Sequence, residues 1–169
     1  MTRLFVAVWL PPEVVAVLSE LERPELPGLR WSPPEQWMVK LRPLGHVDDR
    51  VVAPLLDVLG VELEGAPAAR CVLGPAAVRR YSGQWLGAPV AGLDDLAAVV
   101  FEVTEELVPV THPQPFVAEV PLARGRVPKQ LDGLPVSARW TARSLALVAD
   151  RSSPRAARYE DLGVIPLGS

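Results

Sequence analysis

The sequence contains little of the chemistry that disulfide frameworks and metal centres need. Its 169 residues include one cysteine, Cys71, and two histidines, His46 and His112. A single cysteine excludes a disulfide within the chain and is typical of a reducing compartment, so we expect a cytoplasmic protein. Sites built from several cysteines and histidines are excluded by the same count. We therefore expect no metal and no cofactor.

Several functional motifs are also missing. The chain has no glycine-rich phosphate loop of the G-x-x-x-x-G-K or G-x-G-x-x-G type and no nucleophile elbow. No apolar run approaches the roughly 18 residues that a membrane-spanning helix needs. The short apolar run near the N-terminus stops at Pro11 and Pro12 without a small-residue cleavage site, so we expect neither a secretion signal nor a membrane partner.

The composition is that of a globular chain with short elements. Hydrophobic residues make up 49% and charged residues 22%, which excludes a chain that is disordered throughout. Proline accounts for 19 of the 169 residues, so we expect many loops. This length predicts a single domain over residues 1–169.

Charge is distributed unevenly along the chain. The net charge is −3, yet residues 120–158 hold eight basic and two acidic residues, a local balance of +6. All but Lys40 and Lys129 of the 17 basic residues are arginine, so each lysine stands out from the background. The basic stretch favours either an anionic ligand or an ordinary solvated surface.

The hydrophobic pattern alternates between short strands and amphipathic helices. Residues 37–42 alternate, which places Met38, Lys40 and Arg42 on one strand face and Trp37 on the other. A helix precedes this strand and another precedes 117–122, which suggests two similar lobes with a cleft between them. Strands are expected at 3–10, 29–31, 37–42, 69–73, 76–80, 84–90, 117–122, 144–148 and 159–165, with 69–73 and 76–80 forming a pair. Helices are expected at 12–22, 48–59 and 93–107.

Several segments together resemble the 2H phosphoesterase superfamily, in its branch of 2′-5′ RNA ligases and RNA 2′,3′-cyclic phosphodiesterases. The resemblance covers nearly the whole chain in the right order. It implies an α+β fold of two pseudo-symmetric lobes of antiparallel sheet, with outer helices around a central cleft. We expect a monomer. The segments that carry it are Arg3–Pro11, Leu29–Gln36, Leu41–Gly45, Pro115-Phe116, Leu122–Arg124, Ser144–Val148 and Ala157–Glu160.

The chain departs from this family at the active site. The family carries two His-x-Thr/Ser-x motifs, in which one histidine is the general base, the other is the general acid, and the hydroxyls hold the phosphate. Here Met38 and Lys40 occupy the first motif, and Glu119 and Pro121 occupy the second. His46 and His112 lie outside both motifs. The resemblance therefore implies the fold and a cleft without the family's usual chemistry.

Lys40 and Glu119 are expected to face each other across the cleft, and three roles stay open for them. They form a salt bridge that closes a disused site, or they act as a catalytic acid and base for another reaction. Alternatively, Lys40 binds an anion while Glu119 contacts a ligand hydroxyl or base.

The remaining candidate ligand-binding residues are Met38, Arg42, Pro121 and Arg124. Met38 is either a cleft wall or a contact for an apolar ligand, and Pro121 is either structural or a kink that reshapes the cleft. Arg42 and Arg124 match positions that the family commonly keeps basic near the phosphate, and arginine suits phosphate through its fork of donors. Arg124 needs a bend after Pro121 to reach the cleft.

Three functions follow from these residues. The first is a degenerate 2H phosphoesterase-like protein that binds a nucleotide, an RNA end or another phosphate compound in its cleft. The second is a repurposed enzyme that uses Lys40 and Glu119 for an isomerisation or cyclisation of a non-RNA metabolite, because fold does not determine function. The third is a protein-interaction module.

Overall fold

Two antiparallel sheets form the centre of the molecule in the computed structural model, which describes residues 1–168. The first has the strand order β10-β9-β1-β3, and the second has the order β2-β7-β6-β4-β8 with β5 also paired to β6. The strands of the first sheet are β1 (Thr2–Trp9), β3 (Met38–Val47), β9 (Ser144–Asp150) and β10 (Tyr159–Pro166). Those of the second are β2 (Leu29–Trp31), β4 (Ala69–Leu73), β5 (Val78–Arg80), β6 (Trp85–Ala91), β7 (Glu119–Gly125) and β8 (Ala138–Ala142).

The central strand β1 is buried on both faces, which explains its unbroken apolar sequence. Leu4, Val6 and Val8 point into the main hydrophobic core, which also receives residues of the second sheet. Phe5 and Ala7 point to the opposite face, where they join a smaller apolar cluster. The two faces of the first sheet therefore have different partners.

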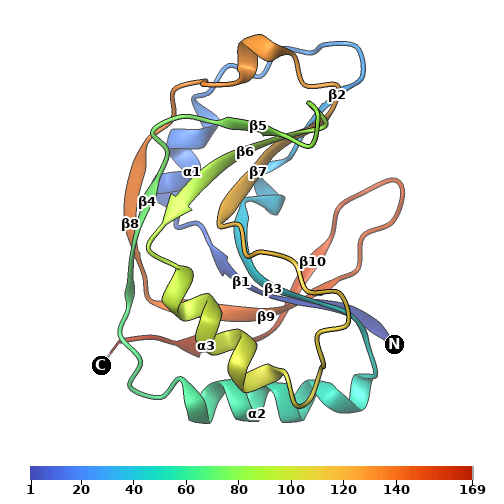
Figure 1. The fold of residues 1–169 in the computed structure, drawn as a ribbon, viewed down its shortest axis with the longest axis vertical. Coiled ribbons are helices and arrows are strands. Elements are labelled where there is room, and N and C mark those ends of the chain that lie inside the picture. The colour runs from blue at the N-terminus through green and yellow to red at the C-terminus, as the bar shows by residue number, and fades with distance from the viewer. Residues whose placement is uncertain (169) are drawn as a thin grey trace.

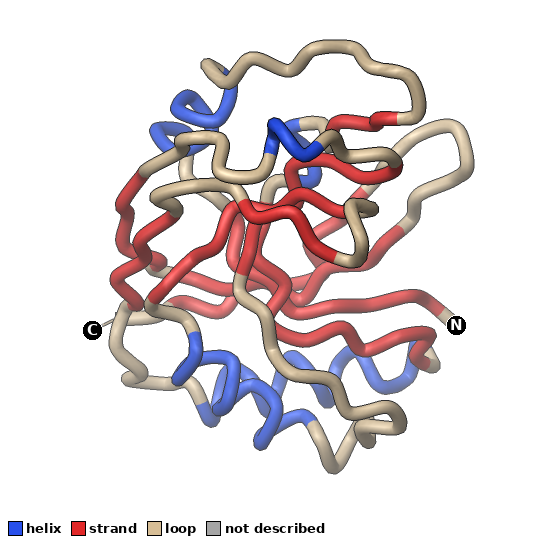
Figure 2. Tube along the Cα trace, turned by 45° about the horizontal axis from the view of Figure 1, so that its top comes forward, coloured by secondary structure: helices blue, strands red, loops and turns tan. Residues whose placement is uncertain are grey.

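Three α-helices cover the sheets: α1 (Pro12–Ser19), α2 (Val52–Glu62) and α3 (Asp94–Thr104). Figure 1 and Figure 2 show α2 and α3 together at one end of the molecule, where they contact each other, β10 and β3. Helix α2 buries Leu55 and Leu59, four residues apart on one face. Asp94 and Asp95 lie in the first turn of α3, where their negative charges interact favourably with the helix dipole.

The structure confirms the predicted α+β fold with two antiparallel sheets. The strands expected at 3–10, 29–31, 84–90, 144–148 and 159–165 are present within two residues of the expected ends. The expected pairing of 69–73 with 76–80 is wrong, because β4 pairs with β6 and β8 while β5 pairs with β6. Strand β8 is not predicted by the sequence pattern. No helix among residues 1–168 is long and apolar enough to cross a membrane.

Candidate functional site

Met38 lies beneath the surface of the face that the first sheet turns away from the main core. It pairs with Trp9 across β1 and β3, and it packs with Phe5, Ala7 and Val148 in the smaller apolar cluster. Its exposed fraction is 1%. Met38 therefore supports the residues above it, and contact with a ligand, as the sequence suggested for it, would require those residues to move.

Lys40 shares that face and remains exposed above the cluster. It pairs with Ala7, and its Nζ lies 4.6 Å from the centroid of the Phe5 ring. Partial burial lowers the pKa of Lys40 below its ordinary value, and the nearby charges of Arg3 and Arg124 lower it further, while Asp150 opposes them. No ion pair within residues 1–168 includes Lys40. Its charge is therefore available to an anion.

Arg42 does not share the strand face of Lys40, so that part of the expectation is wrong, although both residues line one cavity. Ala7 pairs with Lys40 and Val6 pairs with Arg42, which leaves Leu41 as an extra residue in β3. This β-bulge breaks the alternation and turns Arg42 toward the core face, where its exposed fraction is 2%.

The guanidinium of Arg42 donates hydrogen bonds to the C-terminal end of α3 and to the loop that follows it. Its Nη1 donates to Oγ1 of Thr104 at 2.6 Å, and its Nη2 donates to the carbonyl of Val108. The guanidinium carbon lies 5.2 Å from the centroid of the Phe101 ring. Arg42 therefore joins β3 to α3 and to the loop that follows.

Glu119 has partners that the sequence reasoning missed. Its Oε2 accepts from Nε of Arg80 at 3.0 Å, and its Oε1 accepts from the indole nitrogen of Trp85 at 2.7 Å. The predicted salt bridge to Lys40 is wrong, because the ion pair that Glu119 forms within the described chain is the one with Arg80. Arg80 lies on a strand that the sequence predicted, but the register of this strand with β6 could not be predicted from the sequence.

A second β-bulge brings Arg124 to the face of Glu119. Leu86 pairs with Ala123 and Gly87 pairs with Pro121, so Leu122 is the extra residue in β7. The bend that Arg124 was expected to need after Pro121 is thus confirmed, and Pro121 lies on the same face. Arg124 pairs with Trp85 of β6 on one side and with Arg30 of β2 on the other.

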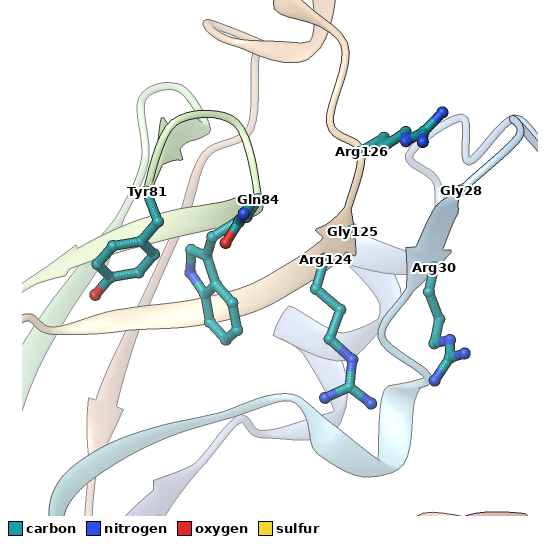
Figure 3. Close-up of a pocket in the computed structure, with 8 residues that line it drawn as sticks. Gly28, Arg30, Tyr81, Gln84, Arg124, Gly125 and Arg126 are labelled. Atoms are coloured by element: carbon teal, nitrogen blue, oxygen red, sulfur yellow. The ribbon is translucent and has the colours of Figure 1, made fainter.

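Two cavities open along this face and meet at Tyr81; together we call them the cleft. The first, of about 680 Å³, includes Arg30, Arg124, Arg126 and Trp85 in its lining. Figure 3 shows Arg30 and Arg124 pointing the same way from adjacent strands, whereas Arg126 points away from them. The first cavity therefore presents two guanidinium groups side by side.

The second cavity, of about 930 Å³, contains the two residues expected to face each other. Lys40 and Glu119 both line it, together with Phe101 and Phe116. A proline-rich loop at 109–117 forms one wall. Lys40 and Glu119 thus border one cavity, each with different neighbours.

The other residues singled out in the sequence lie away from the guanidinium pair. Trp37 is 2% exposed and Cys71 is 1% exposed, both within the main core, and burial raises the pKa of the Cys71 thiol to about 11. His46 lies on β3 and pairs with Arg3. His112 is exposed in the 109–117 loop. Residues 1–168 contain no cluster of histidine, cysteine and carboxylate side chains that could hold a metal ion.

Comparison with protein-family models and with curated proteins finds no match. Solved structures do match over nearly the whole chain. TT0787 of Thermus thermophilus is 27% identical, with a TM-score of 0.83 over 98% of this chain and 97% of that one. LigT of E. coli, in its complex with 3′-AMP, is 20% identical, with a TM-score of 0.82 over 99% of each chain. A phosphoesterase is 18% identical, with a TM-score of 0.83 over 100% of each chain.

These similarities agree with the geometry described above. Two antiparallel sheets flank a cleft, and the positions that the sequence resemblance assigned to the two motifs lie on the strands beside it. The chain therefore has the LigT-like fold of the 2H phosphoesterase superfamily, which confirms at the level of the fold the resemblance drawn from its sequence.

Proposed function

We propose that the cleft binds a nucleotide, an RNA end or another phosphate compound. The observation that carries this proposal is the pair of arginines Arg30 and Arg124, whose side chains extend in the same direction from adjacent strands, with the charge of Arg124 near enough to lower the pKa of Lys40. No ion pair within residues 1–168 uses any of these three cations. Arginine forks hold phosphate through parallel charge-assisted hydrogen bonds.

The aromatic side chains beside these cations favour a nucleotide over inorganic phosphate. Trp85 directly neighbours Arg124 in the sheet, and Tyr81 packs against Trp85 with ring centroids 6.4 Å apart. Aromatic faces stack nucleobases with little dependence on sequence. E. coli LigT has been solved in complexes with 3′-AMP, NADP⁺, ATP and phosphate, which supports a ligand of this class on the same fold.

We further propose that the protein lacks the two-histidine chemistry. Opening a cyclic phosphodiester by that route needs one group to take a proton from water and another to give one to the leaving oxygen. Met38 can do neither, and both carboxylate oxygens of Glu119 already accept hydrogen bonds. The proposal is thus a single-domain, 2H phosphoesterase-like protein with a degenerate active site.

A second candidate function rests on the lowered pKa of Lys40. A lysine whose ammonium is destabilised can exchange a proton nearer neutral pH, so a repurposed enzyme would use Lys40 for proton transfer. Glu119 is less suited to be its partner than the sequence suggested, because Arg80 and Trp85 occupy it. This candidate predicts turnover of a metabolite that Lys40→Met abolishes.

Calorimetric titration with 3′-AMP and with inorganic phosphate tests the main proposal. Arg124→Met and Arg30→Met should each lower the affinity for 3′-AMP on the order of tenfold, since each removes a charged donor. Arg139→Met, which removes an exposed arginine of β8 outside both cavities, is the matched control and should bind normally.

A hydrolysis assay with a 2′,3′-cyclic nucleotide tests the second half of the proposal. We expect no turnover above background. Turnover that disappears in Glu119→Gln or Lys40→Met would overturn the degenerate assignment, and failure of both 3′-AMP and phosphate to bind would overturn the phosphate cleft.

A further inference from the structure

One cross-strand row on the second sheet contains three arginines and a tryptophan. Arg30 of β2 pairs with Arg124 of β7, Arg124 pairs with Trp85 of β6, and Trp85 pairs with Arg80 of β5. Residues directly opposite each other on neighbouring strands point to the same face. Strands lie about 4.8 Å apart, so the backbones at Arg124 and Arg80 are about 10 Å apart with Trp85 between them.

Arg80 is held in place while its terminal nitrogens stay available. Its Nε donates to Glu119, whose side chain is 9% exposed, whereas the side chain of Arg80 is 33% exposed. Within the described residues, Nη1 and Nη2 of Arg80 donate no hydrogen bond to the protein. Half of the guanidinium fork is therefore anchored, and the other half is free to meet an anion.

The same carboxylate fixes the ring of Trp85. The indole nitrogen donates to Oε1 of Glu119, and Tyr81 packs edge-on against the ring. Gly87 leaves room for this arrangement, because a Cβ there would collide with Oε2 of Glu119. Glu119 thus positions a flat aromatic surface and a cation next to each other.

We infer that the row takes a nucleoside that carries phosphate on both sides, as in a nucleoside 3′,5′-bisphosphate, with its base on Trp85. Arg30 and Arg124 bind one phosphate and Arg80 binds the other. The inference rests on the proposed phosphate cleft and extends it past Trp85 to Arg80, which lines neither cavity but is paired with Trp85. Glu119 is then a positioning residue that acts through Arg80 and Trp85.

Two properties of the row favour this ligand over a nucleoside monophosphate. Cations stand on both sides of Trp85, so a ligand with one phosphate leaves one group of cations without a partner. The separation of Arg124 from Arg80 also exceeds the spacing of adjacent phosphates in a diphosphate, which would bind on one side of the ring only. A phosphate on each side of one nucleoside matches the arrangement.

Calorimetry with adenosine 3′,5′-bisphosphate, 3′-AMP and 5′-AMP tests the inference. The bisphosphate should bind on the order of tenfold more tightly than either monophosphate, because its second phosphate adds one charge-assisted hydrogen bond. Arg80→Gln should remove that preference by lowering the affinity for the bisphosphate on the order of tenfold, and it should lower the affinity for 3′-AMP much less. Arg139→Gln is the matched control. Trp85→Leu should weaken all three nucleotides and leave the binding of inorganic phosphate unchanged.

Positioning by Glu119 has its own readout. Glu119→Gln keeps an oxygen for the indole nitrogen but loses the charge that anchors Arg80. The affinity for the bisphosphate should therefore fall more than the affinity for 3′-AMP. Because Arg80→Gln leaves the enclosed carboxylate of Glu119 with one partner, the double variant Arg80→Gln/Glu119→Gln removes both charges together. The double variant should also bind the bisphosphate no more tightly than a monophosphate. Because it leaves no unpaired buried charge, this result would show that the preference is lost through lost binding and not through misfolding.

The outcomes separate this inference from the proposed function. Normal binding of 3′-AMP without a preference for the bisphosphate overturns the second phosphate position alone. Equal weakening of both ligands by Arg80→Gln overturns it as well. Failure of every phosphate compound to bind overturns both proposals. A trinucleotide with phosphates at both ends tells whether the ligand is a nucleic acid strand or a free nucleotide. If Arg80→Gln weakens binding of the trinucleotide as much as binding of the bisphosphate, the ligand is a nucleic acid strand. If Arg80→Gln weakens only the binding of the bisphosphate, the ligand is the free bisphosphate.

Discussion

Replacing Arg42 by methionine should destabilise the protein and leave its ligand affinity intact. Methionine keeps the apolar stem but cannot donate to Thr104 or to the carbonyl of Val108. Hydrogen bonds from a charged donor contribute about 1.5–3 kcal/mol each, and the removed desolvation of the guanidinium offsets part of their loss. We therefore expect a loss of about 3 kcal/mol in the free energy of unfolding, and a fall in Tm of about 6–12 °C for a chain of this size.

Thermal melting and calorimetry on one set of variants check this prediction. Arg42→Met should melt early and still bind 3′-AMP normally at a temperature where it is folded. Arg124→Met should show the reverse, with normal melting and weakened binding, because Arg124 is exposed in the cleft. An Arg42→Met protein that melts like the parent and loses affinity for 3′-AMP would refute the assignment of Arg42 to the core.

Three further predictions follow from the structure. Gly60 lies within α2, and outside its chain neighbours and the backbone of the helix no described atom comes within 4 Å of the position that a Cβ would take there. Gly60→Ala should therefore raise the free energy of unfolding by about 0.5–1 kcal/mol, and an unchanged or lower Tm would contradict this. Cys71 should resist iodoacetamide at about pH 8 until the protein unfolds, since its pKa is raised to about 11 by burial, and rapid alkylation of the folded protein would contradict that. The lowered pKa of Lys40 means that its ammonium loses its proton at a lower pH than an ordinary lysine, so phosphate affinity should decline early as the pH rises. Lys40→Arg, which stays charged, should hold its affinity over about pH 7–10, and identical profiles in calorimetry would contradict the reasoning.

The two β-bulges explain why the sequence predicted the fold better than the site. Runs of apolar residues located β1, β6 and β9, because their residues lie between two packed layers. The alternation of residues 37–42 placed Arg42 beside Lys40, and one extra residue, Leu41, reversed that assignment. A bulge leaves no mark on hydrophobic periodicity, since both Leu41 and its neighbours are compatible with either register.

The opposite result at Arg124 has the same cause. Alternation alone turned Arg124 away from Glu119, and only the family resemblance suggested that a bend brings it back. The extra residue Leu122 provides that bend. The partners of Glu119 could not be predicted either, because Arg80 and Trp85 reach it through the pairing of β5 with β6 and of β6 with β7. Such pairings depend on packing across the whole sheet.

The double role of Glu119 also limits how this cleft can change by mutation. Glu119→His would give the second motif its usual histidine, yet it would release Arg80 and Trp85 at once. Met38→His would place a polar ring in a fully packed apolar cluster. Neither step alone completes a two-histidine pair, and each disturbs contacts that the present cleft uses. On the degenerate assignment proposed above, a two-histidine site therefore requires several coordinated substitutions.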